Sequence, residues 1–170
     1  MIHETVVPQF IKMLGNLSAI LDKGAKYAEE KKFDIEVLLR SRLAPDQFDL
    51  IFQVQVACDT AKLGIARLAG KEKDAPSYPD TEKNLADVKA RIEKTVAYLG
   101  TFKAKDFAGA EERRISQPRW EGKSLSGEQF LHQHVIPNLY FHVTTAYAIL
   151  RHNGVNIGKK DYLGPLPYKQ

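Results

Sequence analysis

Apolar residues recur every three or four positions over long stretches of this sequence, and this period limits the possible folds more than any other feature. In the first segment, over about residues 2–31, the apolar stripe consists of Val6, Phe10, Met13, Leu17, Leu21 and Gly24. Such a repeat places apolar side chains along one face of an α-helix. We therefore expect an all-α protein in which long helices bury their apolar faces against one another.

Two more long helices are predicted in the middle of the chain. The first should begin near Pro45 and end before Gly70, since proline favours a helix start and glycine a helix stop. Its apolar residues fall on two opposite faces, which predicts that it is covered on two sides. The second should begin near residues 79–81 and end at Gly100.

The last helical region is predicted to begin at Ser126, where Gln129 would complete a capping box. Pro137 should kink or restart this helix, because proline lacks the N–H that continues the hydrogen-bond ladder. The segment before it, residues 101–125, contains helix-breaking glycine and proline and is predicted to form a flap. Residues 155–170 should form an extended C-terminal tail.

Four long amphipathic helices in a chain of 170 residues predict a four-helix bundle. This length fits a single domain, and we assign residues 1–170 to it.

Charge and composition exclude several classes of partner. The net charge is +4, and the densest charged stretch, residues 71–94, mixes six basic with six acidic side chains. Mixed signs are typical of a solvated surface, so we expect no nucleic-acid partner. No uncharged apolar run approaches the ~20 residues that span a bilayer, so we expect no membrane partner. The single cysteine, Cys58, and the lack of an apolar signal segment predict a cytoplasmic protein.

The candidate functional residues lie on the second and the last predicted helices. His142 follows Asn138 by four positions, so both share one face of the last helix. The second helix carries two polar stripes between its apolar faces. These are Gln55, Asp59 and Lys62 on one side, and Gln53, Thr60 and Arg67 on the other. We expect Gln55 and Asp59 to face His142 across a polar interhelical pocket.

Two interpretations of this pocket are open from the residues alone. In the first, His142 is hydrogen-bonded to Asp59 or Asn138 in a partly buried polar cluster. In the second, His142 and Asp59 hold a divalent metal ion, Zn or Ni, together with water, since imidazole and carboxylate are ligands of such metals.

Residues 137–154 (PNLYFHVTTAYAILRHNG) and 158–164 (GKKDYLG) resemble a bacterial family of unknown function in the DinB/YfiT-like metalloenzyme superfamily. Residues 53–62 (QVQVACDTAK) and 67–70 (RLAG) resemble the same family. The resemblance covers nearly the whole chain. It implies an up-down-down-up four-helix bundle that is often dimeric.

The resemblance also implies where a metal would be held. Superfamily members that bind a metal use one histidine of the second helix and a His-x3-His pair of the last. Here His142 matches the pair, Asn138 stands at its first position, and the second helix offers Gln55 or Asp59. The usual three-histidine site is therefore expected to be lacking.

These observations predict an uncharacterised DinB-like bundle protein that binds a small molecule or a partner in a polar pocket. The alternative is a metal-dependent hydrolase or thiol transferase that uses His142 with Asp59. A homodimer is also predicted, because apolar residues on the outer sides of the second and last helices need a further neighbour. They are Phe52, Val56 and Leu63 on the second helix, and Phe141 and Ala148 on the last.

Overall fold

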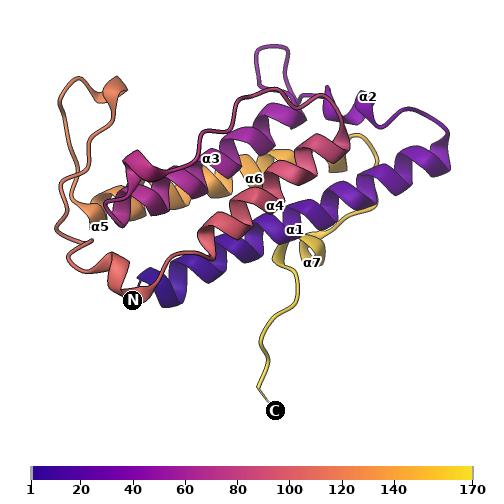
Figure 1. Cartoon of the computed structure of the whole chain (residues 1–170). Helices are drawn as coiled ribbons and strands as arrows, with labels where there is room; N and C mark the ends of the chain where they lie inside the picture. The colour runs from indigo at the N-terminus through magenta and orange to yellow at the C-terminus, as the bar shows by residue number, and fades with distance from the viewer. Residues whose placement is uncertain (1, 170) are drawn as a thin grey trace.

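The computed structural model describes residues 2–169, and four long helices dominate it (Figure 1). They are α1 (Ile2–Lys31), α3 (Leu50–Leu68), α4 (Leu85–Leu99) and α6 (Ile136–His152). Helix α3 packs against both α4 and α6, and α1 also packs against both. In Figure 1, α1 and α6 run in one direction along the molecule, and α3 and α4 run in the other.

Shorter elements connect the long helices. They are α2 (Glu36–Leu39), η1 (Glu72–Asp74), η2 (Ala104–Phe107), η3 (Pro118–Trp120), α5 (Gly127–Phe130), η4 (Leu131–Val135) and α7 (Lys159–Leu163). Within residues 2–169 there is no β-strand, and the one bridge of β type joins Ile115 to Leu125. The predicted all-α class is therefore confirmed. No helix of this part of the chain is long and apolar enough to cross a lipid bilayer.

The two middle helices begin later than we predicted from Pro45 and from residues 79–81. Helix α3 starts at Leu50 instead of near Pro45, because Asp49 accepts a hydrogen bond from the Phe52 backbone N–H at 3.0 Å. A side-chain cap of this kind satisfies a free N–H of the first turn, which proline cannot do.

The same effect determines the start of α4. This helix begins at Leu85, not at residues 79–81, and the Asn84 side chain accepts from the Asp87 N–H at 2.9 Å. The preceding segment is thereby left free to cross the outside of the bundle as an irregular connection, residues 69–84.

The last helical region begins as predicted. Ser126 accepts from the Gln129 N–H at 3.2 Å, and the Gln129 side chain accepts from the Ser126 N–H at 3.1 Å, which completes a capping box. Pro137 is accommodated by a π turn, η4, after which the chain continues as α6. There the N–H of Ile136 reaches back five residues to the carbonyl of Leu131. The wider turn relieves the clash that a proline ring would cause in a regular α-helix.

Close approach between α3 and the π turn depends on Gly64. A Cβ atom at this position would lie 2.5 Å from Cγ1 of Val135, so only glycine lets the two backbones come so near. Val135 is buried there, and Leu139 one turn later is fully buried as well. The π turn and the second half of α3 therefore form one closely packed wall.

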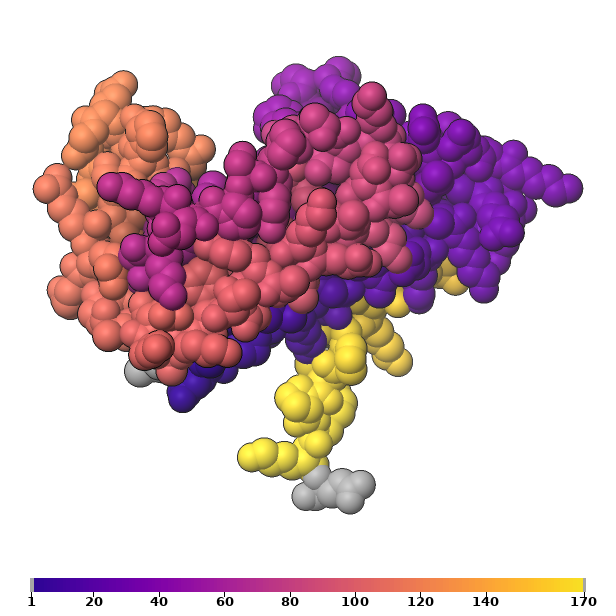
Figure 2. Space-filling view, in the orientation of Figure 1, coloured from indigo at the N-terminus to yellow at the C-terminus, as the bar shows by residue number. Residues whose placement is uncertain are grey.

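Residues 101–125, for which we keep the name flap, are fastened at their base to the end of α3. Arg113 donates from Nε to the carbonyl of Leu68 at 3.1 Å and so caps the end of α3. Two backbone hydrogen bonds of 2.9 Å join Ile115 and Leu125 across the flap. Figure 2 shows the flap, in orange, rising beside the magenta residues that follow α3, with the surface hollowed between them.

The C-terminal tail packs on the bundle only in its first part. Val155 and Ile157 are buried, and α7 lies against α1. Asp161 forms an ion pair with Lys23 at 2.6 Å, which fastens α7 to α1. Residues 165–169 extend away from the body of the molecule (Figures 1 and 2).

Candidate functional site

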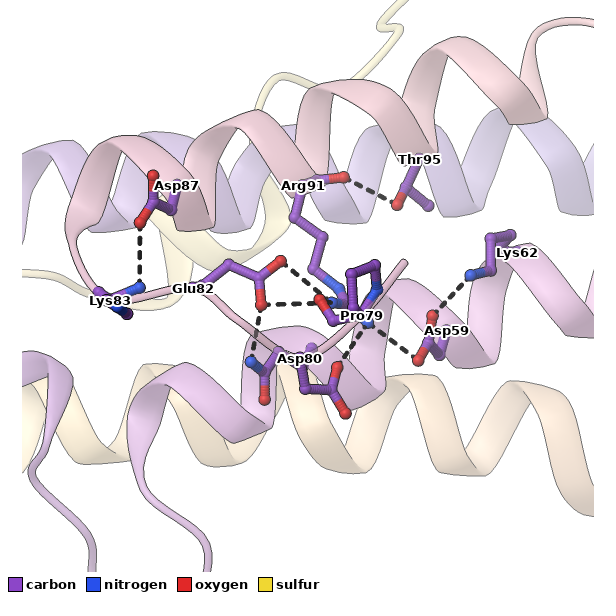
Figure 3. A network of polar contacts seen from close by, with 10 residues as sticks. Asp59, Lys62, Pro79, Asp80, Glu82, Lys83, Asp87, Arg91 and Thr95 are labelled. Atoms are coloured by element: carbon purple, nitrogen blue, oxygen red, sulfur yellow. Dashed lines mark hydrogen bonds and ion pairs between the residues drawn. The ribbon is translucent and has the colours of Figure 1, made fainter. Parts of the chain in front are cut away.

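The buried guanidinium of Arg91 organises the polar groups between α3 and α4 (Figure 3). Its side chain is 1% exposed and forms ion pairs with Asp59 at 2.9 Å, Asp80 at 3.0 Å and Glu82 at 3.0 Å. Gln55 donates to the second oxygen of Glu82 at 2.7 Å. Asp59 and Gln55 come from α3, whereas Asp80 and Glu82 come from the connection over residues 69–84. Arg91 therefore fastens this connection across α3 and α4.

A second buried cation completes the cluster. The Nζ atom of Lys62, whose side chain is 3% exposed, lies 2.9 Å from Oδ1 of Asp59. The same ammonium group sits 4.0 Å from the centre of the Tyr78 ring, in a cation–π contact. Two cations thus face three carboxylates, and Asp59 is shared between both cations.

The contacts within this cluster favour the ionised form of Glu82. Burial by itself would raise the pKa of Glu82, but the hydrogen bond from Gln55 and the contacts with Arg91 lower it below its usual value. Burial raises the pKa of the nearby Cys58 thiol to about 12. A buried thiol with a raised pKa stays protonated at neutral pH, which is typical of an inert core cysteine.

His142 is partnered by a residue that we did not predict. Its Nδ1 atom lies 2.7 Å from Oε1 of Gln53, and burial lowers the pKa of the imidazole. The neutral ring therefore donates from Nδ1 to the amide oxygen. The predicted partners were Asp59 or Asn138, and Asn138 instead donates to Oγ1 of Thr60 at 2.8 Å.

The cause of this error is the rotation of α3. Of the two polar stripes on this helix, the one that contains Gln53 and Thr60 meets α6, and the one that contains Gln55 and Asp59 meets α4. The expected grouping of Gln55 and Asp59 with His142 is replaced by two clusters on different sides of α3.

The donors present do not fit a metal ion. Asp59 is engaged by Arg91 and Lys62, and the Nδ1–H of His142 is held by Gln53, so that ring offers a metal only its Nε2 atom. Over residues 2–169, no three His, Cys, Asp or Glu side chains are grouped so that they could hold one. Zinc and nickel sites in proteins need three or more such donors. We therefore derive no metal-dependent step for this protein.

A cavity of about 320 Å³ lies between α3, the π turn with the start of α6, and the flap. Two of the predicted site residues, Asp59 and Asn138, line it, whereas Gln55 and His142 are outside its lining. The lining consists of Val56, Asp59, Thr60, Leu63, Gly64, Arg67, Gln117, Pro118, Arg119, Phe130, His134, Val135 and Asn138. We call this space the flap cavity.

His134 in the π turn has a defined tautomer. Arg119 of the flap approaches its Nε2 atom at 2.9 Å, and because a guanidinium only donates, Nε2 must accept. Burial, with the charges of Arg119 and Arg67, lowers the pKa of His134, so the ring is neutral. Its proton is therefore on Nδ1, which is buried without a hydrogen-bond partner among the described residues.

Gln117 brings a second such group to the cavity. The residue is 8% exposed, and its Nε2 atom has no hydrogen-bond partner within residues 2–169. Trp120 of the flap packs against two lining residues, with its ring centroid 5.4 Å from that of His134 and 6.0 Å from that of Phe130.

Sequence reasoning missed Gln117, Arg119 and His134 as site residues. The signal that could have found them is the pairing of a proline-interrupted helix with a long irregular segment before it, since π turns often mark functional sites.

Comparison with known proteins gives the family. A family model described as a domain of unknown function, DUF1993, matches residues 2–163, and the chain belongs to this family. A DinB family member protein from Shewanella denitrificans, known from a crystal structure, is 60% identical to this chain in sequence. The two structures superpose with a TM-score of 0.94. The alignment covers 96% of this chain and 92% of that one. A search of curated proteins finds no match. The resemblance to a DinB-like family of unknown function is thus confirmed.

The Arg91 cluster leads to a prediction about stability. Arg91→Met leaves three carboxylates facing one another, so the free energy of unfolding should fall by about 3 kcal/mol, near the lower end for a broken buried ion pair because Asp80 is half exposed. Urea denaturation at neutral pH measures this. The matched control is Lys89→Met, which breaks the exposed pair of Lys89 with Asp22 between α4 and α1 and should cost at most about 1 kcal/mol. Equal losses in both variants would contradict the assigned role of Arg91.

Proposed function

We propose that this protein is a DinB-like bundle, running up-down-down-up, that binds a small organic molecule in the flap cavity. One observation carries the proposal: the Gln117 side chain is more than nine-tenths buried, lines the cavity, and leaves its amide donor without a partner. Leaving a buried donor unsatisfied costs about 1–3 kcal/mol, so such groups are usually paired in the functional state.

The size and lining of the flap cavity support this proposal. Its volume of about 320 Å³ falls at the lower end of the range for small-molecule sites, roughly 300–1,000 Å³. Val56, Leu63 and Phe130 provide apolar walls, and Gln117 and Arg119 bring polar groups from the flap. Mostly apolar walls with a few convergent polar groups are typical of ligand sites.

Filling the cavity tests the proposal. We expect benzamide, benzoate or phenyl phosphate at millimolar concentration to give a saturation-transfer NMR signal with the protein. Val56→Phe places a larger ring in the cavity and should abolish the signal. Val37→Phe, at an exposed position on α2, should leave it unchanged. Failure of all three compounds to bind, or binding that survives Val56→Phe, would contradict the proposed site.

We also infer a homodimer formed through aromatic residues at the outer side of α3 and α6. Val56 and Leu63 line the flap cavity, so the flap covers part of the apolar surface for which the sequence predicted a further neighbour. Phe48 and Phe141 are 54% and 57% exposed, and Phe48 stacks on Phe52 with 4.1 Å between ring centroids. Exposed aromatic groups of this kind favour an interface, and a two-fold dimer is the commonest closed solution.

Light scattering tests the dimer. We expect a mass of twice 19.2 kDa at micromolar concentration. Phe141→Asp should reduce it to the monomer mass, since a charge at the centre of the interface would be buried without a partner. Tyr168→Asp, at an 84% exposed position of the tail, should not change it. A monomer mass that persists when the unmodified protein is concentrated would refute the dimer.

A further inference from the structure

Two polar atoms of residues that line the flap cavity are donors without a partner among the described residues. Nε2 of Gln117 is an amide nitrogen, and Nδ1 of His134 carries the ring proton because Nε2 accepts from Arg119. The third atom without a hydrogen bond, the acceptor Oδ1 of Asp59, lies 2.9 Å from the ammonium group of Lys62 and is thus held by an ion pair. The amide of Asn138, in contrast, already donates to Thr60. A molecule that satisfies this cavity must therefore present hydrogen-bond acceptors.

The charge at the flap side of the cavity favours an anion. Asp59 is the one carboxylate among the lining residues, and its two oxygens are held by Lys62 and Arg91, in the cluster that also contains Asp80 and Glu82. Arg67 is paired with Glu72 at 2.7 Å. Arg119 contacts no carboxylate among the described residues; its polar contact is the neutral ring of His134. One uncompensated cation thus remains at the flap side of the cavity.

The lining residues supply both polar and apolar side chains. Gln117 and Arg119 line the cavity from the flap, and Val56 and Leu63 of α3, with Phe130 of α5, supply apolar side chains. A guanidinium and an amide together recognise a carboxylate or a phosphate through charge-assisted hydrogen bonds.

We propose that the ligand of the flap cavity is a small organic anion, a carboxylate or a phosphate monoester, whose charged group binds Arg119 and Gln117 and whose apolar body packs against Val56, Leu63 and Phe130. This inference rests on the proposed function, because it names the chemical class of the molecule that binds there. It specifies the sign of the ligand's charge and the orientation of the ligand in the cavity, which the shape of the cavity alone does not determine.

Four probes of similar size test the sign of the charge. They are benzoate and phenyl phosphate as anions, benzamide as the neutral analogue and benzylamine as the cation. Trp120 is the one tryptophan of the chain and packs against His134 and Phe130, so its fluorescence reports binding. We expect at least one anion to bind ten-fold or more tightly than benzamide, and benzylamine to bind more weakly than benzamide. The two anions show whether carboxylate or phosphate is preferred.

Two flap variants provide the matched comparison. Arg119→Met should remove the preference for the anion over benzamide. Arg114→Met removes a flap arginine that binds Oγ of Ser124 and is outside the cavity lining, so it should retain the preference.

The outcomes separate this inference from the proposed function. If benzamide binds as tightly as both anions, the anion inference is overturned while the proposed cavity stands. If the anion preference is lost equally in Arg114→Met and Arg119→Met, the assigned position of the charged group is wrong. If none of the four probes changes the fluorescence or the saturation-transfer signal, both the proposed function and this inference fail.

Discussion

Arg91 is a buried cation, and the rest of the polar architecture depends on how its charge is compensated. Burying a guanidinium is costly unless carboxylates surround it closely, and here three do so within 3.0 Å. One of them, Asp59, belongs to α3, and the other two belong to the connection over residues 69–84. Because Arg91 pairs with carboxylates of both α3 and this connection, α3 is held with its Gln55–Asp59 stripe toward α4. The opposite stripe, with Gln53 and Thr60, is thereby directed at α6.

This rotation of α3 explains why the chemistry lies where it does. His142 meets an amide, Gln53, rather than a carboxylate, so its ring takes part in a hydrogen-bonded pair. Further along α3, Gly64 lets the π turn approach closely, and the flap crosses over the space that remains. The flap cavity therefore results from three local features: a glycine in α3, a proline in the last helix and an irregular segment between α4 and α5.

Much of the fold could be predicted from the sequence, because apolar periodicity and side-chain caps are local signals. The bounds of α1 and the capping box at Ser126 followed from such signals. The starts of α3 and α4 were predicted too early, since Pro45 and Pro79 were given more weight than the caps Asp49 and Asn84. The site was harder. Both polar stripes of α3 were visible in the sequence, but which one faces α6 depends on the position of Arg91, and that is a tertiary property. Gln117, Arg119 and His134 come together only through the path of the flap, for which no periodic pattern exists.

The side-chain amide of Gln117 offers the most direct test that the flap cavity receives an acceptor group. In a protein labelled with ¹⁵N, its NH₂ resonances can be followed while phenyl phosphate or benzoate is added. We expect a saturable shift of the Gln117 amide with at least one of these anions and no shift of the Gln53 amide, which is held between the Phe48 carbonyl and His142. An unmoved Gln117 amide under conditions where these anions bind, or equal shifts of both amides, would contradict this expectation.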